Sequence, residues 1–174
     1  FDYAAVAAGL CEISYNGIPF TEKFGSRQRF HMIITDAELP ATPLEESSIC
    51  AGCRNCADSC PLGAISKTET EEVEICGKKF TVGKIDLEKC KVCENGAVVN
   101  RFSPDSEPDR IAAVCNRTCM CHLEENDRLT NKFANTFRTQ APWAIGADTV
   151  TMDRSDEQAN DLGGQFSKTG KRGH

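Results

Sequence analysis

This 174-residue chain has no long hydrophobic run and few of the motifs that carry catalysis. No stretch approaches twenty consecutive apolar residues, so the sequence does not predict a membrane-spanning helix. Acidic residues outnumber basic ones by 26 to 20, and the one basic cluster (Lys168, Lys171 and Arg172) is near the C-terminal end, so no nucleic-acid-binding surface is predicted. A phosphate-binding glycine loop, a paired-histidine motif and a nucleophile–base pair are also missing, which leaves no sign of independent catalysis.

Cysteine, in contrast, is abundant, with eleven residues. Cys50, Cys53, Cys56 and Cys60, followed at once by Pro61, form the pattern C-x2-C-x2-C-x3-C-P. This run is typical of bacterial ferredoxins, in which three thiolates hold one [4Fe–4S] cluster and the fourth binds another. A tight loop can bring three sulfurs to one cluster but directs the fourth away. The motif therefore predicts a second cysteine set downstream.

The second set is present in an interrupted form. Cys90 and Cys93 make C-x2-C, Cys115 and Cys119 make C-x3-C, and 21 residues separate the two pairs. If the ferredoxin exchange of ligands holds, the first cluster is bound by Cys50, Cys53, Cys56 and Cys119. The second is then bound by Cys90, Cys93, Cys115 and Cys60. The eight ligands are a firmer expectation than their division into two groups.

Other chemistry is open to these cysteines. A disulfide framework would leave one of the eleven thiols unpaired, and a chain of this length can bury a core without such cross-links. Zinc commonly takes separated C-x2-C pairs, so Cys90 and Cys93 alone fit zinc equally well. The first quartet with its proline does not. A non-redox role, in which clusters or zinc only staple an interaction domain, stays open.

Three cysteines lie outside the motifs and are interpreted as incidental thiols: Cys11, Cys76 and Cys121. Cys76 falls at the tip of a hairpin predicted from the alternation of Val73, Ile75, Phe80 and Val82 around it. A helix expected over 109–129 carries Cys115 and Cys119 on one face and turns Cys121 away.

The charged and apolar residues near the motifs each have two possible roles, one functional and one purely structural. His122 would lie near the helix stripe of the last ligands and either tunes a cluster or is simply solvated. Glu69, Glu71, Glu72 and Glu74 either steer a basic electron partner or form a solvated strand face. The apolar residues Leu62, Ile65, Val92 and Val114 either shield clusters from water or are plain core, and N–H···S hydrogen bonds are expected around Cys53 and Cys93.

The chain divides into three predicted segments with an α+β composition. Residues 1–45 begin with a helix over 2–10, continue through an Asn16-Gly17 turn to a strand over 30–35, and end in a linker at Pro40 and Pro43. Residues 46–125 hold both cysteine sets as a two-cluster domain with an insertion in its second motif. Residues 126–174 form a C-terminal extension that begins helically, passes Pro142-Trp143 and ends in a polar tail, expected to be mobile or to wrap a partner.

The front half of the chain resembles a known family in the order of its motifs. They are Ala7-Ala8-Gly9-Leu10-Cys11-Glu12-Ile13-Ser14-Tyr15-Asn16-Gly17, then Thr21-Glu22-Lys23-Phe24-Gly25-Ser26-Arg27, then Ile34-Thr35-Asp36. Over about residues 4–145 the chain is similar to the C-terminal part of the corrinoid-dependent reductases, which include reductive dehalogenases and epoxyqueuosine reductase. The later segments Asp86–Cys90 and Cys115–Glu125 look most like uncharacterised ferredoxin-domain relatives.

The resemblance implies an electron-transfer role. In that family a nitroreductase-like domain holds a corrinoid, and a two-cluster domain supplies it with electrons. Residues 1–45 would then be the tail of the nitroreductase-like fold, and nearly all of the corrinoid-binding domain would precede Phe1. The glycine pattern Gly-Leu-Gly-Glu-Ile-Gly is altered here at Cys11 and Ser14. No catalytic residue is carried over, because the matching positions are not in this chain.

Two functional expectations follow. The first is a module that passes electrons through two [4Fe–4S] clusters to a partner redox protein, and the second is the C-terminal part of a corrinoid-dependent reductase whose catalytic domain lies upstream. Clusters and free thiols fit a reducing, low-oxygen cytoplasm. No signal peptide is found in these residues, and the start at Phe1 rather than Met is compatible with the export of a longer precursor.

Overall fold

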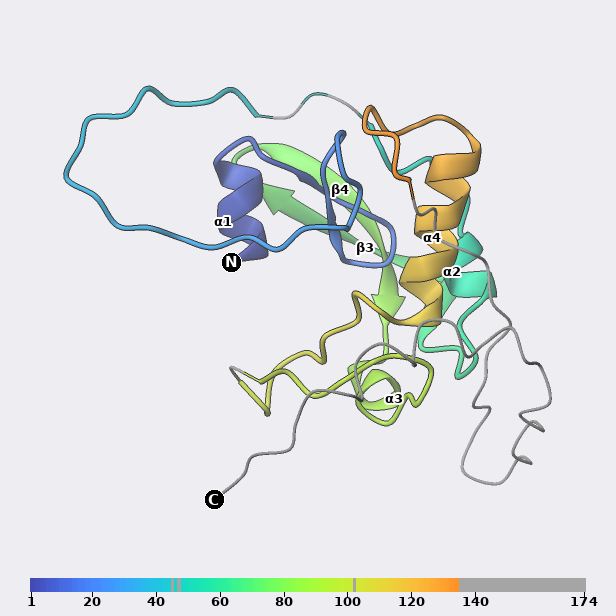
Figure 1. Cartoon of the computed structure of the whole chain (residues 1–174). Coiled ribbons are helices and arrows are strands. Elements are labelled where there is room, and N and C mark those ends of the chain that lie inside the picture. Colours follow the sequence, from blue (N-terminus) through green and yellow to red (C-terminus); the bar gives the residue numbers. More distant parts are fainter. Residues whose placement is uncertain (45, 47, 102, 135–174) are drawn as a thin grey trace, which may run out of the picture.

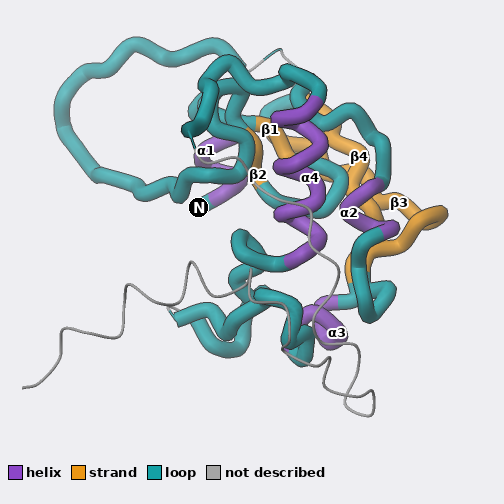
Figure 2. Tube along the Cα trace, turned by 45° about the vertical axis from the view of Figure 1, so that its right-hand side comes forward, coloured by secondary structure: helices purple, strands orange, loops and turns teal. Residues whose placement is uncertain are grey.

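The computed structural model describes residues 1–44, 46, 48–101 and 103–134. Its elements, in chain order, are α1 (Asp2–Ala7), β1 (Glu12–Ile13), β2 (Pro19–Phe20), α2 (Asn55–Asp58), β3 (Ile65–Ile75), β4 (Lys78–Ile85), α3 (Leu87–Lys91) and α4 (Val114–Glu125). Within these residues the strands pair as two small antiparallel sheets, β1–β2 and β3–β4. The fold is a small mixed α/β structure, consistent with an α+β class. Loops make up much of the trace (Figure 2).

The long hairpin of β3 and β4 confirms the prediction from alternating apolar residues. Ile75 faces Lys78 across a two-residue turn, and Val73 faces Phe80. Cys76 and Gly77 make the turn with φ values of 50° and 81°. Positive φ at both positions is the geometry that matches the twist of a two-residue hairpin. Near its other end the ladder is interrupted by a register shift between Ile65 and Thr70.

The smaller sheet is closed by the predicted turn at Asn16 and Gly17. The Ser14 amide donates to the Ile18 carbonyl at 3.1 Å, and the Ser14 hydroxyl donates to Asn16 Oδ1 at 2.6 Å. Gly17 has φ of 76°, which an L side chain rarely adopts. The turn is therefore held by its own buried polar side chains.

The predicted strand over 30–35 is wrong. Residues 28–44 form no strand or helix. Phe30 packs against a core cluster, and the exposed residues 31–43 run as a wide loop (Figure 1). Ile33 and Ile34 are 87% and 95% exposed. A strand needs a hydrogen-bonding neighbour, and the described residues bring none beside this apolar run.

Two predicted helices form over shorter ranges. The first begins as expected but ends at Ala7, ahead of Gly9 with its φ of 72°. The second spans Val114–Glu125 rather than 109–129, because Asp109 instead pairs with Val98 in a bridge. Leu129 lies beyond the helix yet is buried.

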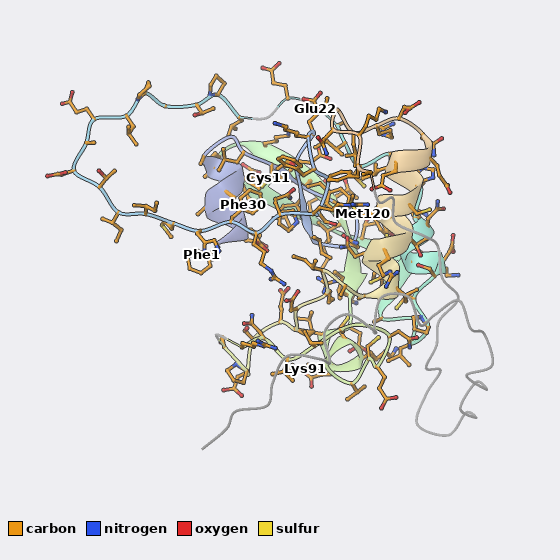
Figure 3. The ribbon with its side chains drawn as sticks, in the orientation of Figure 1. Phe1, Cys11, Glu22, Phe30, Lys91 and Met120 are labelled. Atoms are coloured by element: carbon orange, nitrogen blue, oxygen red, sulfur yellow. The ribbon has the colours of Figure 1, made fainter. Side chains whose placement is uncertain are left out.

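The core joins the front of the chain to the cysteine segments. Its larger cluster includes Tyr15 and Phe20 together with Ile65, Met120 and Leu123. Figure 3 labels Met120 on α4, where its sulfur accepts a hydrogen bond from the Ser26 amide at 3.1 Å. The division into three predicted segments stays a prediction, and most of the predicted C-terminal extension, residues 135–174, lies outside the described residues. No helix in the described part of the chain combines the length and apolar character needed to cross a bilayer.

Candidate metal centre

The first cysteine loop is shaped by two left-handed residues. Gly52 has φ of 63° and Arg54 has φ of 64°, so the backbone turns twice between Cys50 and Cys56. The short helix α2 then begins and carries Cys56, which is buried. In both views α2 lies beside α4 (Figures 1 and 2), and their side chains pack together. This arrangement places Cys56 next to the helix that carries Cys119.

Five sulfurs from this region are electrostatic neighbours. Burial, followed by the sulfurs of Cys50 and Cys115 and then that of Cys53, raises the pKa of Cys56 to about 12. Burial raises the pKa of the Cys119 thiol still further, and the sulfurs that add to the effect are those of Cys56, Cys50, Cys53 and Cys115. The structure therefore brings together the four cysteines that sequence assigned to a first cluster, and it places Cys115, assigned to the second, beside them.

The second motif is brought together by closure of its insertion. Cys90 is buried on α3, whose N-cap Asp86 accepts a hydrogen bond from the Lys89 amide. The insertion after Cys93 is pinned at its base, where the Val114 amide donates to the Asn95 carbonyl at 2.9 Å. The 21 inserted residues thus leave and return at neighbouring points.

A cavity is formed where these segments meet. Its lining includes Cys60, Cys90, Cys93 and Cys115, the four cysteines that sequence assigned to a second cluster. Burial raises the pKa of Cys115 to about 11, and the sulfurs of Cys60 and Cys90 add to the rise. Burial also raises the pKa of Cys90, with smaller contributions from the sulfurs of Cys60 and Cys93.

Two of the sulfurs accept backbone hydrogen bonds. The Tyr15 amide donates to Cys50 Sγ at 3.3 Å, and the Ala64 amide donates to Cys60 Sγ at 3.2 Å. The expected N–H···S bonds around Cys53 and Cys93 are not seen in the described residues. The donors come instead from the β1–β2 turn and from the start of β3, which sequence spacing does not reveal.

The apolar residues near the cysteines divide into two kinds. Leu62, Ile65 and Val114 line the cavity, and the last two are fully buried. Val92 is 71% exposed. The expectation that Val92 excludes water is therefore wrong, because the C-terminal end of α3 turns it toward solvent.

Arg110 is the neighbour of the cysteines that sequence reasoning missed. Its side chain is buried, lines the cavity of the second group, and lowers the pKa of Cys90 and Cys115 against the effect of burial. Its Nη1 donates to the Asn16 carbonyl at 2.8 Å, across 94 residues of sequence. Nothing local in the sequence marks this long-range contact.

The remaining candidates lie apart from both groups. Cys11 is buried and Cys76 exposed, and the Cys121 thiol donates to Glu125 at 3.1 Å. His122 Nδ1 lies 3.2 Å from the Asn126 side-chain amide, near the end of α4. The four glutamates are on β3, where Glu69 pairs with Lys84 at 2.9 Å and Glu72 with Lys79 at 3.6 Å, a pattern of a solvated strand face.

The spacing of the sulfurs bears on which metal centres the donor set could hold. In the described part of the chain, no three His, Cys, Asp or Glu side chains converge tightly enough to bind one metal ion. Each thiolate of a four-iron cluster binds its own iron, so its sulfurs lie further apart than the ligands of one zinc ion. Two groups of four cysteines, two N–H···S bonds and a buried arginine fit anionic clusters.

Comparisons with known proteins agree with the cysteine motifs. Over 94 residues, 52% of this chain, it is 38% identical to the tetrachloroethene reductive dehalogenase of Dehalobacter restrictus. A tetrachloroethene reductive dehalogenase of Desulfitobacterium hafniense is 36% identical over 106 residues, 59% of this chain. About half of the chain is homologous to reductive dehalogenases.

The homology covers only part of this chain and only part of each relative. The chain spans 15% to 17% of the length of these dehalogenases. An uncharacterized polyferredoxin-like protein of Methanocaldococcus jannaschii is 35% identical over 74 residues, 41% of this chain and 43% of its own length. No family model matches this chain, and no solved structure does so.

Proposed function

We propose that this chain is an iron–sulfur electron-transfer module with a ferredoxin-like arrangement of two [4Fe–4S] clusters. The observation that carries the proposal is the grouping of the sulfurs. Cys50, Cys53, Cys56 and Cys119 are neighbours, with Cys115 beside them, and Cys115 also lines one cavity with Cys60, Cys90 and Cys93. This arrangement supports the exchange of the fourth ligand that the motif implies.

Each residue has a defined task in such a module. The cysteine sets Cys50, Cys53, Cys56, Cys119 and Cys60, Cys90, Cys93, Cys115 would each hold one cluster, which supplies one-electron transfer when bound. The amides of Tyr15 and Ala64 hydrogen-bond to the ligand sulfurs and favour the reduced state. Leu62, Ile65 and Val114 keep water from the second group.

The partner is proposed from the partial homology. Electrons would pass to a redox protein or to a catalytic domain upstream in the same polypeptide, in a reducing, low-oxygen compartment where clusters persist. The names of the matched proteins, a reductive dehalogenase and a polyferredoxin-like protein, support oxidoreductase chemistry of this kind.

A second candidate has support of its own. The 38% identity to a stretch of a reductive dehalogenase favours a chain that acts as the C-terminal part of a corrinoid-dependent reductase. The nitroreductase-like origin of residues 1–45 belongs to this candidate. The two candidates share the cluster sites and differ in whether a corrinoid accompanies the polypeptide.

Metal analysis of protein purified without oxygen tests both candidates. We expect about eight irons per chain, with stoichiometric cobalt added only if the chain travels with a corrinoid. Zinc in place of iron would overturn both.

Matched cysteine variants test the ligand assignment. Cys56→Ala should lose about half of the iron and much of the helical signal, because cluster binding and folding are coupled. Cys76→Ala is the control and should keep its iron, since Cys76 is exposed at the hairpin turn. Iron loss in Cys76→Ala would show that the ligand assignment is wrong.

A further inference from the structure

Arg110 is a buried cation whose ion-pair partner in the described structure, Glu107, is loosely paired and largely exposed. Its residue is 6% exposed, and the nearest acidic oxygen recorded for its guanidinium belongs to Glu107, at 3.8 Å from Nη2. The Glu107 side chain is itself 65% exposed. A buried charge is costly unless an opposite charge compensates it. The compensating charge is therefore expected from another side of the guanidinium.

The other side of Arg110 is the cavity of the second cysteine group. Arg110 lines this cavity together with Cys60, Cys90, Cys93 and Cys115. Four thiolates with an iron–sulfur core are anionic overall, so a bound cluster would supply the buried compensating charge that the exposed Glu107 does not.

The guanidinium is fixed in place by the β1–β2 turn. Its Nη1 donates to the buried Asn16 carbonyl at 2.8 Å. A Cβ at Gly17 would lie 3.4 Å from Nη2 and 3.1 Å from the Ile85 side chain. Because Gly17 has no side chain, the guanidinium can occupy the space beside the turn. Its hydrogen bond to Asn16 then holds the charge at one position.

The arginines that approach the first cysteine group are exposed. Arg128 is one of them, and it donates to the Ile49 carbonyl, next to Cys50, at 3.1 Å. The raised pKa values of Cys56 and Cys119 come from burial and from neighbouring sulfurs, and no arginine or lysine contributes among the described residues. Arg54 lies in the same loop, but it is exposed and donates to the Lys67 carbonyl, so water screens its charge.

We propose that Arg110 makes the reduction potentials of the two sites different. It raises the potential of the site at Cys60, Cys90, Cys93 and Cys115 above that of the site at the other four cysteines. A fixed positive charge in a poorly solvated site favours the more negative, reduced state. Because the second site has the higher potential, an electron supplied by a low-potential one-electron donor passes from the first site to the second. In that transfer, the first site loses the one electron that the second gains. This inference rests on the proposed two-cluster function.

The test is a redox titration of the iron-loaded full chain with dithionite, followed by electron paramagnetic resonance. In Arg110→Gln, the ratio of reduced second site to reduced first site should fall at least about tenfold. This change corresponds to ~59 mV for a one-electron couple. Arg110→Lys keeps the charge and should retain most of the separation. Arg29→Gln is the control, because Arg29 is an exposed arginine paired with Asp109, and it should change neither potential.

The two signals are assigned by single ligand variants. Cys93→Ala should remove the higher-potential signal and Cys53→Ala the lower-potential one. The reverse assignment overturns the proposal, even if Arg110→Gln fails to bind iron. Unchanged potentials in an iron-loaded Arg110→Gln also overturn it and leave the two-cluster function intact. A wild-type chain without reducible iron overturns the function itself and the tuning with it.

Discussion

Cys11 shows how burial dominates the chemistry of a residue in this protein. Its side chain is 1% exposed and packs in the smaller core cluster with Val6, Phe80 and Val82. Burial, and then the charges of Asp2 and Glu12, raise the pKa of Cys11 from 9.0 to about 12. The thiol therefore behaves as a small apolar side chain at neutral pH.

A pH dependence of stability follows from Cys11. Its folded-state pKa lies above the unfolded value, so the folded chain holds the proton more tightly. The stability contributed by the neutral thiol is fully present below about pH 9 and is lost as pH rises from 9 toward 12. We expect the difference in urea midpoint between the wild type and Cys11→Ala to shrink over this range.

The measurement is a set of urea unfolding curves from pH 7 to pH 11 on the two iron-loaded proteins. The comparison cancels the titration of groups that the two proteins share. A difference in midpoint that stays constant with pH would contradict the raised pKa.

At the scale of elements, the insertion between α3 and α4 depends on one close backbone approach. Gly96 has φ of 90°, and a Cβ there would lie 2.5 Å from the Ala112 carbonyl oxygen. Real Cβ atoms do not approach backbone so closely, and this oxygen cannot swing away. Gly96 thus lets the two ends of the insertion meet, which returns Cys115 to the side of Cys93.

Gly96→Ala should therefore weaken the second site and the fold. We expect a loss of stability of about 1–2 kcal/mol from the left-handed backbone alone, with a further loss from the clash. Gly77→Ala is a matched control, because Gly77 has φ of 81° but nothing within 4 Å of its Cβ position. Equal urea midpoints and equal iron contents in the two variants would contradict this role for Gly96.

The elements that sequence predicted well are those fixed by neighbouring residues. The β3–β4 hairpin follows from local alternation, and the turn at Asn16 and Gly17 is held by Ser14 within the same turn. The strand expected over 30–35 failed because β propensity carries no information about a partner strand. Arg110 was missed for a related reason, since its contact with Asn16 crosses 94 residues.

In the candidate site, too, features fixed by local sequence were predicted and long-range contacts were not. The cysteine spacing predicts eight ligands in two groups, because ligand geometry constrains the sequence directly, and this assignment stays a prediction. The donors to Cys50 and Cys60 were not predicted, because the Tyr15 amide reaches Cys50 from 35 residues away and backbone donors leave no mark in side-chain identity. Whether the two groups bind clusters stays a prediction for metal analysis to test.

As a whole, the described molecule has little regular structure to hold it together. Its sheets are two-stranded, and two-stranded sheets are marginal by themselves. The eight candidate ligands come from three separate stretches, Cys50–Cys60, Cys90–Cys93 and Cys115–Cys119. Bound clusters would join these stretches and stabilise the fold through the bonds they make.

Removal of iron should consequently unfold much of the protein. We expect the chelated, iron-free chain to have a lower urea midpoint than the iron-loaded one, with helical circular dichroism lost first, because metal binding and folding are coupled. Reconstitution with iron and sulfide under reducing conditions should restore the midpoint. Equal midpoints before and after chelation would show that the protein core alone stabilises the fold.

The closed base of the insertion also bears on how much sequence length this fold tolerates. The pairing of Val98 with Asp109 and the bond from the Val114 amide to the Asn95 carbonyl hold the two ends together, and the segment between them projects from the body of the molecule (Figure 1). Residues added or removed beyond that pairing need not displace any cysteine. Chains with the same ligands can thus differ in length at this point and present different surfaces to different partners.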